Sequence, residues 1–212
     1  VILHQAGLKA YIPFYRETVD TALASIPLYN YYSYRSDSIH RVRVAENMYL
    51  RNDFIDTIRT RILQSEVKEP GKYLYSDNDF IFLGMIVEAV SGRPLERYVK
   101  EEFYDKLNMG STGFRPRERF PLNYIAPTEE ELGFRQQLLH GDVHDPGAAL
   151  FGGVAGHAGL FSNAYDLSVL GEVLLRGGEL NGIRFFKKET VDYFTSYQSN
   201  TRRGLGWDKP ER

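Results

Sequence analysis

The chain has 212 residues, of which 42% are hydrophobic and 25% are charged, and its formal net charge is −2. This composition is ordinary for a globular protein large enough to bury a core, and the near-neutral charge gives no broad electrostatic reason to bind nucleic acid or an anionic membrane. The absence of cysteine excludes disulfides, thiolate catalysis and cysteine-bound zinc. No apolar stretch approaches the roughly 20 residues of a membrane span, and no signal-peptide pattern occurs.

The first quarter of the chain combines an irregular segment with a helix. Residues 11–49 are rich in aromatic side chains and irregular, and their last stretch, "IPLYNYYSYRSDSIHRVRV", predicts either a short strand pair or an extended loop. The stretch "NDFIDTIRTRIL" that follows predicts a helix, because Ile55, Ile58 and Ile62 recur at helical spacing and Asn52 or Asp53 can cap its start.

The stretch "SDNDFIFLGMIVEAVSG" carries the clearest helical pattern. Ser76 and Asp79 fit a capping box at its start, and Gly92 stands where a C-terminal cap glycine belongs. Apolar side chains recur on one face between these two signals. A second helix is expected directly after it, with Pro94 at its first turn.

Residues 110–156 hold many glycines and prolines and few periodic signals, and are therefore expected to be mostly loop. The stretch "NAYDLSVLGEVLLRGG" predicts another helix, capped by Asn163 and closed by Gly177 or Gly178. We expect a short strand at "GIRFF" and a last short helix at "KKETVDYFTS". Helices outnumber strands in these predictions, so the expected fold class is mainly α with a few short strands.

The stretch "GKYLYSDNDFIFLGMIVEAVSGRPLERYVKEEFYDKLNMGSTGF" resembles the serine beta-lactamase and penicillin-binding-protein superfamily, in its class C and esterase branch. The stretch "ILHQAGL" resembles the segment that follows the nucleophile helix of that family. Residues 152–175 resemble its glycine-rich wall loop and the helix behind that loop. The complete family fold is α+β, with an antiparallel sheet flanked by helices. The resemblance implies that residues 1–212 form a single partial domain, its helical portion.

In that family a serine attacks an acyl carbonyl, a lysine one helical turn later helps to deprotonate it, and a tyrosine relays the proton. The resemblance assigns the tyrosine role to Tyr75 and the third position of the same motif to Asp77. An aspartate there can accept a hydrogen bond from the lysine, but its negative charge opposes ionisation of the phenol. The resemblance also implies that the nucleophile helix precedes Val1 and that the final strand motif follows Arg212.

The tripeptide Ser-Asp-Asn at residues 76–78 allows two other interpretations. It is an element of class A beta-lactamases, but that branch also needs a glutamate-containing loop and a Lys-Thr-Gly strand, and no Lys-Thr-Gly occurs in this sequence. Ser76 can alternatively be a plain helix cap, a role that is compatible with either chemistry.

Two other short motifs imitate catalytic elements. Ser65 and Lys68 satisfy Ser-x-x-Lys, but Pro70 directly after them interrupts any helix that would align the two side chains. His157-Ala158-Gly159 imitates the strand-edge motif, yet a capped helix rather than more strand follows it. We instead assign Gly156, His157 and Gly159 to substrate binding in the wall loop, where glycine lets the backbone approach a ligand closely.

The stretch "HGDVHDPG" raises the question of a metal site. His140 and His144 are four residues apart, but Gly141 and Pro146 argue against a helix that would align them. We expect a polar loop with no metal and no cofactor.

These observations predict part of a serine hydrolase whose parent protein cleaves an ester, amide or lactam through an acyl-serine intermediate. The fragment alone is expected to be inactive and to self-associate through surface exposed by truncation. By resemblance, the substrate is a small molecule or cell-wall peptide, the parent protein is periplasmic or secreted, and "LHQAGLKAYIPFY" is similar to modules that follow a glycoside hydrolase. The alternative is a non-catalytic module that binds cell-wall sugar or peptide through aromatic residues 11–34.

Overall fold

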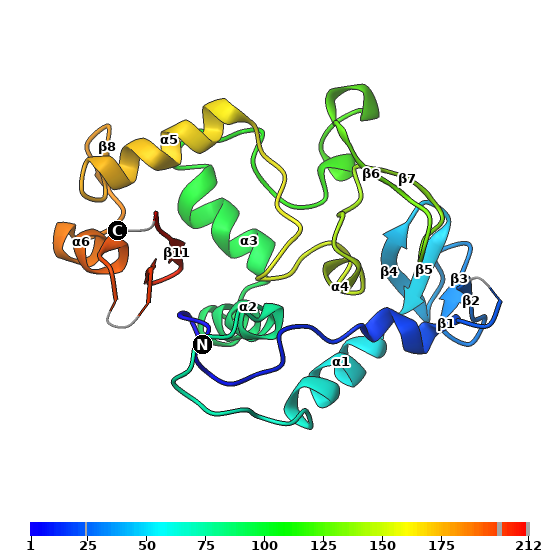
Figure 1. Cartoon of the computed structure of the whole chain (residues 1–212). Coiled ribbons are helices and arrows are strands. Elements are labelled where there is room, and N and C mark those ends of the chain that lie inside the picture. Colours follow the sequence, from blue (N-terminus) through cyan, green and yellow to red (C-terminus); the bar gives the residue numbers. More distant parts are fainter. Residues whose placement is uncertain (24, 199–200, 211–212) are drawn as a thin grey trace. The chain divides into compact units, whose positions relative to one another are not determined.

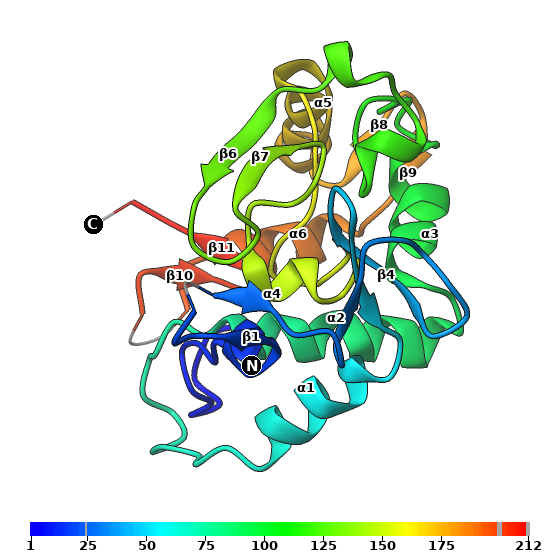
Figure 2. The ribbon, with the colours of Figure 1, turned by 90° about the vertical axis from the view of Figure 1, so that its right-hand side faces the viewer.

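The computed structural model describes residues 1–23, 25–198 and 201–210, and Figures 1 and 2 show its elements in two views. The chain divides into two compact units, each assembled from separate segments. Unit 1 comprises Val1–Ala10, Val67–Gly113 and Ser162–Arg212. Unit 2 comprises Tyr11–Glu66 and Phe114–Phe161.

A three-stranded antiparallel sheet organises the first part of unit 2. Its strands are β3 (Tyr32–Ser33), β4 (His40–Ala45) and β5 (Met48–Arg51), in the order β3-β5-β4. Met48 and Leu50 are buried while the two residues that alternate with them are partly exposed, which is the period of two that a half-buried strand requires. A separate strand pair joins β1 (Val19–Asp20) to β2 (Ile26–Pro27).

Helix α1 (Phe54–Leu63) follows this sheet and confirms the helix predicted there. It buries Phe54, Ile58 and Ile62 on one face. Two of the three predicted isoleucines are therefore buried, while Ile55 is partly exposed and Phe54 takes its place. Asp53 precedes the helix, but its carboxylate binds Arg51 instead of capping the first turn. The remaining short helices of unit 2 are η1 (Phe14–Thr18), η3 (Pro116–Glu118), η4 (Leu122–Tyr124) and α4 (Pro146–Ala149).

A hairpin that the sequence did not predict joins β6 (Pro127–Glu131) to β7 (Gln137–His140). Its turn is organised by the carboxylate of Glu131, which accepts hydrogen bonds from the backbone N–H groups of residues 133, 134 and 135. The Arg135 side chain is fully buried, lies 3.2 Å from the Glu131 carboxylate, and donates to two backbone carbonyls. The ion pair between Glu131 and Arg135 therefore stabilises the turn of this hairpin.

Unit 1 contains the longest helices, and those predicted for this part of the chain are confirmed. Helix α2 (Asp77–Ser91) ends at Gly92, whose φ of 66° is the left-handed conformation that favours glycine. The other helices are α3 (Leu95–Val99), which continues into the π-helical turn η2 (Lys100–Tyr104), α5 (Ala164–Leu175) and α6 (Lys188–Thr195). Two hairpins pair β8 (Glu179–Leu180) with β9 (Ile183–Arg184) and β10 (Arg203–Gly204) with β11 (Trp207–Asp208). No helix in the described part of the chain is long and apolar enough to cross a membrane.

The core of unit 1 lies between η2, α5 and the β8–β9 hairpin. Leu107, Met109 and Val173 are buried together, and aromatic side chains of the hairpin region pack against them. The rings of Phe103 and Phe186 stack at a centroid distance of 5.6 Å. This packing fixes α5 beside the loop that follows η2.

The predicted fold class, mainly α, is wrong. The structure is 34% helix and 17% strand, and the strands form several small sheets. The physical reason is strand length, because strands of two to six residues leave no periodic pattern long enough to recognise. Residues 110–156 accordingly contain the β6–β7 hairpin as well as loop.

Replacing Arg135 with Met is expected to lower the free energy of unfolding by about 3 kcal/mol, because it leaves the Glu131 carboxylate without its buried cationic partner. The matched control is Arg59→Met, since Arg59 pairs with Asp56 at the surface and should contribute less than about 0.5 kcal/mol. Urea unfolding followed by circular dichroism measures both. Equal effects of the two substitutions would contradict the structural role of Arg135.

Candidate active site

Tyr75 stands immediately before the N-terminal cap of α2. Ser76 has extended backbone angles, and its side-chain oxygen accepts the N–H of Asp79 at 3.4 Å. The cap by Ser76 is confirmed, but the predicted capping box is incomplete, because the Ser76 N–H donates to His4 Nδ1 and not to the Asp79 carboxylate. The cap places Tyr75 at the positive end of a 15-residue helix, where developing negative charge is stabilised.

The Tyr75 side chain is 55% exposed, so its ring is not packed in the core of unit 1. One face of the ring contacts the imidazole of His4, at a centroid distance of 4.4 Å. The guanidinium carbon of Arg203 lies 5.9 Å from the ring centroid. Arg203 is itself buried and donates to the hydroxyl of Tyr73 at 3.2 Å. Tyr75 is thus accessible to solvent on a structured backbone.

Residues 4–10 run alongside the start of α2 and bind it through main-chain and side-chain groups. The carbonyl of Lys9 accepts both the Ser76 hydroxyl at 2.6 Å and the Asn78 amide at 2.7 Å. The N–H of Asp77 donates to the carbonyl of Ala10 at 3.0 Å. Ser76 and Asn78 are buried, so these bonds replace water as their partners.

Two titratable groups are buried beneath Tyr75. Burial lowers the pKa of His4, and the nearby charge of Arg203 lowers it further. Burial raises the pKa of Asp79, whose two carboxyl oxygens have no hydrogen-bond partner among the described residues. The His4 and Asp79 side chains approach to 3.8 Å. Both shifts favour the uncharged forms that a buried environment prefers.

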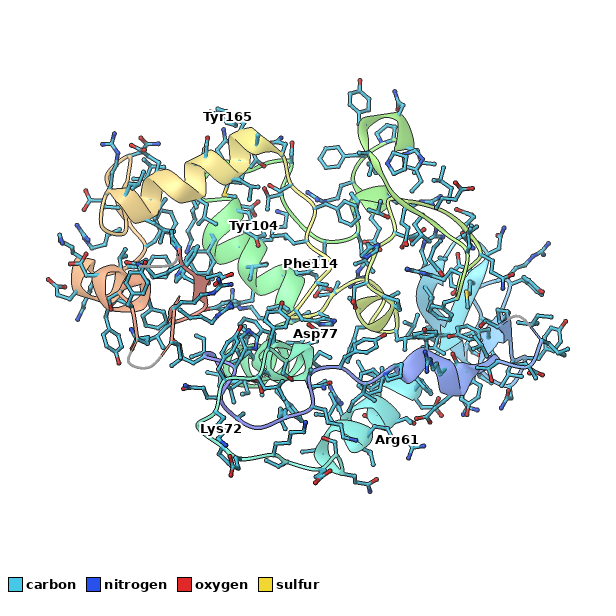
Figure 3. The ribbon with its side chains drawn as sticks, in the orientation of Figure 1. Arg61, Lys72, Asp77, Tyr104, Phe114 and Tyr165 are labelled. Atoms are coloured by element: carbon cyan, nitrogen blue, oxygen red, sulfur yellow. The ribbon has the colours of Figure 1, made fainter. Side chains whose placement is uncertain are left out.

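Asp77, the second residue to which we assign a catalytic role, is the first residue of α2 and is partly buried (Figure 3). Tyr75 and Asp77 are therefore held on either side of the buried cap residue. Their catalytic roles stay predictions, since the geometry fixes where these residues lie and not the reaction that they serve.

The three residues assigned to substrate binding belong to unit 2, in the loop that follows α4. Gly159 has a φ of 111°, and a Cβ there would lie 2.2 Å from the carbonyl oxygen of Gly153, so only glycine fits. Gly156 is a partly exposed bend residue. The loop leads into α5, which begins after Asn163, so residues 157–159 lie on no strand of the described chain. Substrate binding by this loop stays a prediction.

His157 lies in that loop but does not expose its imidazole. The side chain is 5% exposed, and its Nε2 pairs with the carboxylate of Asp145 at 2.9 Å. Burial would raise the pKa of Asp145, but the hydrogen bonds from His157 and from the N–H of Ala148 lower it below the ordinary value. Sequence reasoning missed this pair, because 12 residues separate its members and no motif links them.

Ser65 and Lys68 are not aligned by a helix. Helix α1 ends at Leu63, and the Ser65 hydroxyl donates to the carbonyl of Ile62 at 2.8 Å, as a residue at a helix end does. Lys68 lies in the irregular segment beyond. The expected break in the helix is therefore confirmed, and the absence of a catalytic role for this pair stays a prediction.

The histidines and aspartates of "HGDVHDPG" have separate partners. His140 Nε2 contacts the carbonyl of Ile125 at 2.6 Å, His144 pairs with Glu129 at 2.8 Å, and Asp142 accepts from Arg43 at 2.8 Å. Within the described residues, no group of three or more His, Asp or Glu side chains is arranged to hold a metal ion.

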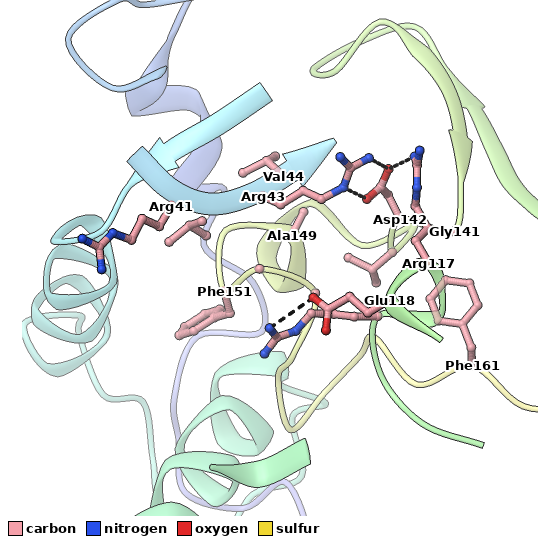
Figure 4. A pocket seen from close by; sticks show the side chains of 15 residues that line it. Arg41, Arg43, Val44, Arg117, Glu118, Gly141, Asp142, Ala149, Phe151 and Phe161 are labelled. Atoms are coloured by element: carbon pink, nitrogen blue, oxygen red, sulfur yellow. Dashed lines mark hydrogen bonds and ion pairs between the residues drawn. The ribbon is translucent and has the colours of Figure 1, made fainter. Parts of the chain in front are cut away.

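A cavity of about 280 Å³ in unit 2 is lined by arginines and by the backbone of the residue 149–153 turn (Figure 4). Arg43 and Arg117 both bind the carboxylate of Asp142 at its edge, at 2.8 and 3.3 Å. Phe151 and Phe161 are among the apolar residues of the wall, together with Val42, Val44 and Val143. Most of the positive charge of the arginines that line this cavity is therefore paired with the carboxylates of Asp142 and Glu118.

Comparison with known proteins adds family information to this geometry. The family model described as Beta-lactamase matches residues 2–209. A protein of Escherichia coli (strain K12) named "Putative D-alanyl-D-alanine carboxypeptidase" is 42% identical over 153 residues, which are 66% of this chain and 35% of that protein. A protein of Salmonella enteritidis with the same name is 39% identical over the same shares. The chain spans about a third of the length of these curated relatives.

Solved structures show the same fold at much lower identity. A D-amino acid amidase from Ochrobactrum anthropi SV3 superposes with a TM-score of 0.53 at 14% identity, over 97% of this chain and 52% of its own. An octameric penicillin-binding protein homologue from Pyrococcus abyssi has a TM-score of 0.53 at 17% identity, over 92% of this chain and 37% of its own. At these identities the likeness concerns the fold alone.

The Asp145–His157 pair predicts a pH dependence of stability. The folded-state pKa of Asp145 lies below 3.8, so its contribution is fully present above that pH and is lost as pH falls through the folded pKa. Asp145→Asn should therefore lower the free energy of unfolding by about 1.5 kcal/mol at pH 6, and this difference should shrink below about pH 4.

Urea unfolding at pH 3, 4, 5 and 6 measures this dependence. The matched control is Asp56→Asn, which changes an exposed carboxylate and is expected to cost less than about 0.5 kcal/mol. A difference for Asp145→Asn that stays constant from pH 6 to pH 3 would contradict the assigned direction.

Proposed function

Because the chain belongs to the beta-lactamase family, a family of serine hydrolases, we propose that it is part of an enzyme that cleaves an ester, amide or lactam through an acyl-serine intermediate. In this proposal residues 1–212 contribute the tyrosine, Tyr75, of that active site. The family's nucleophile is a serine followed three residues later by a lysine, and in this sequence only Ser65 and Lys68 have that spacing. Since these two are not aligned by a helix, we assign the nucleophile to a segment outside the 212 residues.

The observation that carries this proposal is the placement of Tyr75. It is more than half exposed, it directly precedes a buried helix cap, and the backbone on both of its sides is hydrogen-bonded to residues 4–10. A proton-transfer group must be reachable by substrate and fixed in direction, and Tyr75 combines both properties.

The chemistry proposed for Tyr75 is transfer of a proton. Its phenolic oxygen takes the proton from the attacking serine while its own O–H proton passes to the departing atom of the substrate, so the phenol is neutral before and after the step. The positive end of α2 stabilises negative charge on that oxygen, while Asp77 opposes it and can bind the cationic lysine. The helix terminus and the carboxylate together allow a proton to pass without leaving a full charge on the phenol.

For the substrate, we propose the amide bond of a peptide that ends in D-alanine. The support is the name shared by relatives 42% and 39% identical to this chain. Such peptides occur in the bacterial cell wall, so we place the enzyme in the periplasm or outside the cell.

Tyr75→Phe is expected to lower kcat at least about 100-fold, because it removes a proton-transfer group and leaves the ring in place. Ser65→Ala should change kcat by less than about twofold, because its hydroxyl only binds the end of α1. Both are measured by steady-state kinetics in a protein that carries these 212 residues together with the Ser-x-x-Lys helix, with a D-alanyl-D-alanine peptide and a nitrophenyl ester as substrates. The reverse ranking would mean that the wrong motif has been chosen.

A second candidate function is binding of a cell-wall saccharide without catalysis, and one observation favours it. A cavity of about 370 Å³ in unit 2 is lined by Tyr29 and Tyr34, whose side chains are 80% and 70% exposed. Asn47 and Gln137 supply polar groups to the same cavity. Exposed aromatic faces beside amide groups suit the C–H faces and hydroxyls of a sugar.

The 212-residue chain alone distinguishes the two functions. Under the hydrolase proposal, a fluorophosphonate probe should leave its intact mass unchanged, because residues of a catalytic unit achieve little without their nucleophile. Under the saccharide proposal, calorimetry should detect N-acetylhexosamine oligomers binding, with affinity lost in Tyr29→Ala and kept in Tyr124→Ala, a control at another exposed tyrosine. Stoichiometric labelling of a serine within residues 1–212 would contradict both.

A further inference from the structure

His4 holds the backbone on both sides of Tyr75. Its carbonyl accepts the N–H of Leu74 at 2.8 Å, and its Nδ1 accepts the N–H of Ser76 at 3.0 Å. These are the amide groups of the residues directly before and after Tyr75. A single residue thus fixes the chain on either side of the tyrosine, which leaves Tyr75 little freedom to change its backbone direction.

The imidazole of His4 also contacts the tyrosine ring. Its centroid lies 4.4 Å from that of the Tyr75 ring and 4.9 Å from that of the Phe80 ring, and its plane is tilted by 33° and 32° from theirs. Tyr73 meets its edge at 6.1 Å. Because His4 is only 2% exposed, its imidazole is held in place by its neighbours, and its contact with the Tyr75 ring limits the rotation of that ring.

The hydrogen bond from Ser76 fixes the protonation state that His4 needs. Nδ1 can accept that N–H only while it carries no proton, so the neutral ring holds its proton on Nε2. Burial, followed by the charge of Arg203, lowers the pKa of His4 and favours this neutral form. The backbone φ of His4 is 54°, a conformation uncommon outside glycine, and it orients carbonyl and ring toward the same segment.

We propose that His4 is a positioning residue for catalysis: its carbonyl, its Nδ1 and its ring together fix the direction of the Tyr75 hydroxyl. This inference rests on the proposed proton-transfer role of Tyr75. His4 takes no part in bond making, and its effect passes entirely through the tyrosine. Misplacement of a catalytic group by about 1 Å can cost on the order of 100-fold in rate, which sets the scale expected for its loss.

The kinetic test uses a protein that contains these 212 residues and the Ser-x-x-Lys helix. His4→Ala should lower kcat by about 10-fold or more with KM changed by less than about threefold, since substrate binding is left intact. His4→Asn, whose side-chain oxygen can replace Nδ1 as acceptor, should stay within about threefold of the parent kcat. His4→Phe, which keeps a flat ring without the acceptor, should resemble His4→Ala. His144→Ala is the matched control, since His144 is 66% exposed, and it should leave kcat unchanged.

A double-mutant cycle separates positioning from general damage to the fold. If His4 acts through Tyr75, then His4→Ala should add less than about twofold to the loss already caused by Tyr75→Phe. A loss that multiplies fully in the double variant would overturn the proposal. Unchanged kcat in both His4→Ala and His4→Phe would overturn it too.

A spectroscopic arm tests the contacts without any assay of activity. In the 212-residue chain, the Ser76 amide proton should exchange slowly with solvent, remain slow in His4→Asn and become at least about 10-fold faster in His4→Phe. If these exchange rates are as expected but Tyr75→Phe keeps full activity, the positioning is real and the proposed function of Tyr75 is wrong. Fast exchange of the Ser76 amide proton in the unsubstituted 212-residue chain would contradict the proposal that His4 positions Tyr75.

Discussion

The first turn of α2 is the constraint on which the candidate site depends. The N–H groups at the start of a helix have no partner inside it, and here they are buried and must be satisfied by other groups. Ser76 accepts one of them, and the carbonyl of Ala10 accepts the N–H of Asp77. The helix can begin at this position only where residues 4–10 are in place beside it. The first turn of α2 and its contacts with residues 4–10 therefore form together, and both determine the backbone position of Tyr75.

This start of α2 is a buried polar network rather than an apolar core. Ser76, Asn78 and Asp79 are each no more than 1% exposed, and the carbonyl of Lys9 uses both of its lone pairs to accept from two of them. Buried polar groups cost free energy unless they are paired, so apolar side chains would stabilise this region as well or better. What the polar groups add is direction, because hydrogen bonds specify orientation while apolar contacts do so much less. Such an arrangement is consistent with a site that must hold the Tyr75 side chain in one orientation.

The helical parts of the chain could be predicted from sequence because their signals are local. Ser76, Gly92 and Asn163 mark helix ends by rules that need only a few neighbouring residues. The hairpin centred on Glu131 and Arg135 could not be predicted, since its stability comes from one buried ion pair and not from a periodic apolar pattern.

The candidate site residues also include some features that local sequence predicts and others that only tertiary contacts determine. The position of Tyr75 before a capped helix followed from the local pattern, whereas its contact with His4 did not, because 71 residues separate them. Likewise the glycines of the 156–159 loop predicted a tight loop, but nothing in the sequence indicated that His157 would turn inward to Asp145. Side-chain direction in loops depends on partners that only the tertiary structure brings close.

The division of the chain into interleaved segments has a consequence for the order of folding. Unit 2 is complete in sequence once Phe161 has been synthesised, whereas unit 1 still lacks its last segment, Ser162–Arg212. Until that segment is available, Leu107 and Met109 have no Val173 to pack against, and Tyr73 has no Arg203. During synthesis, the hydrophobic surface of unit 1 stays exposed longest, and that interval is when chaperones and proteases have most access to the nascent chain.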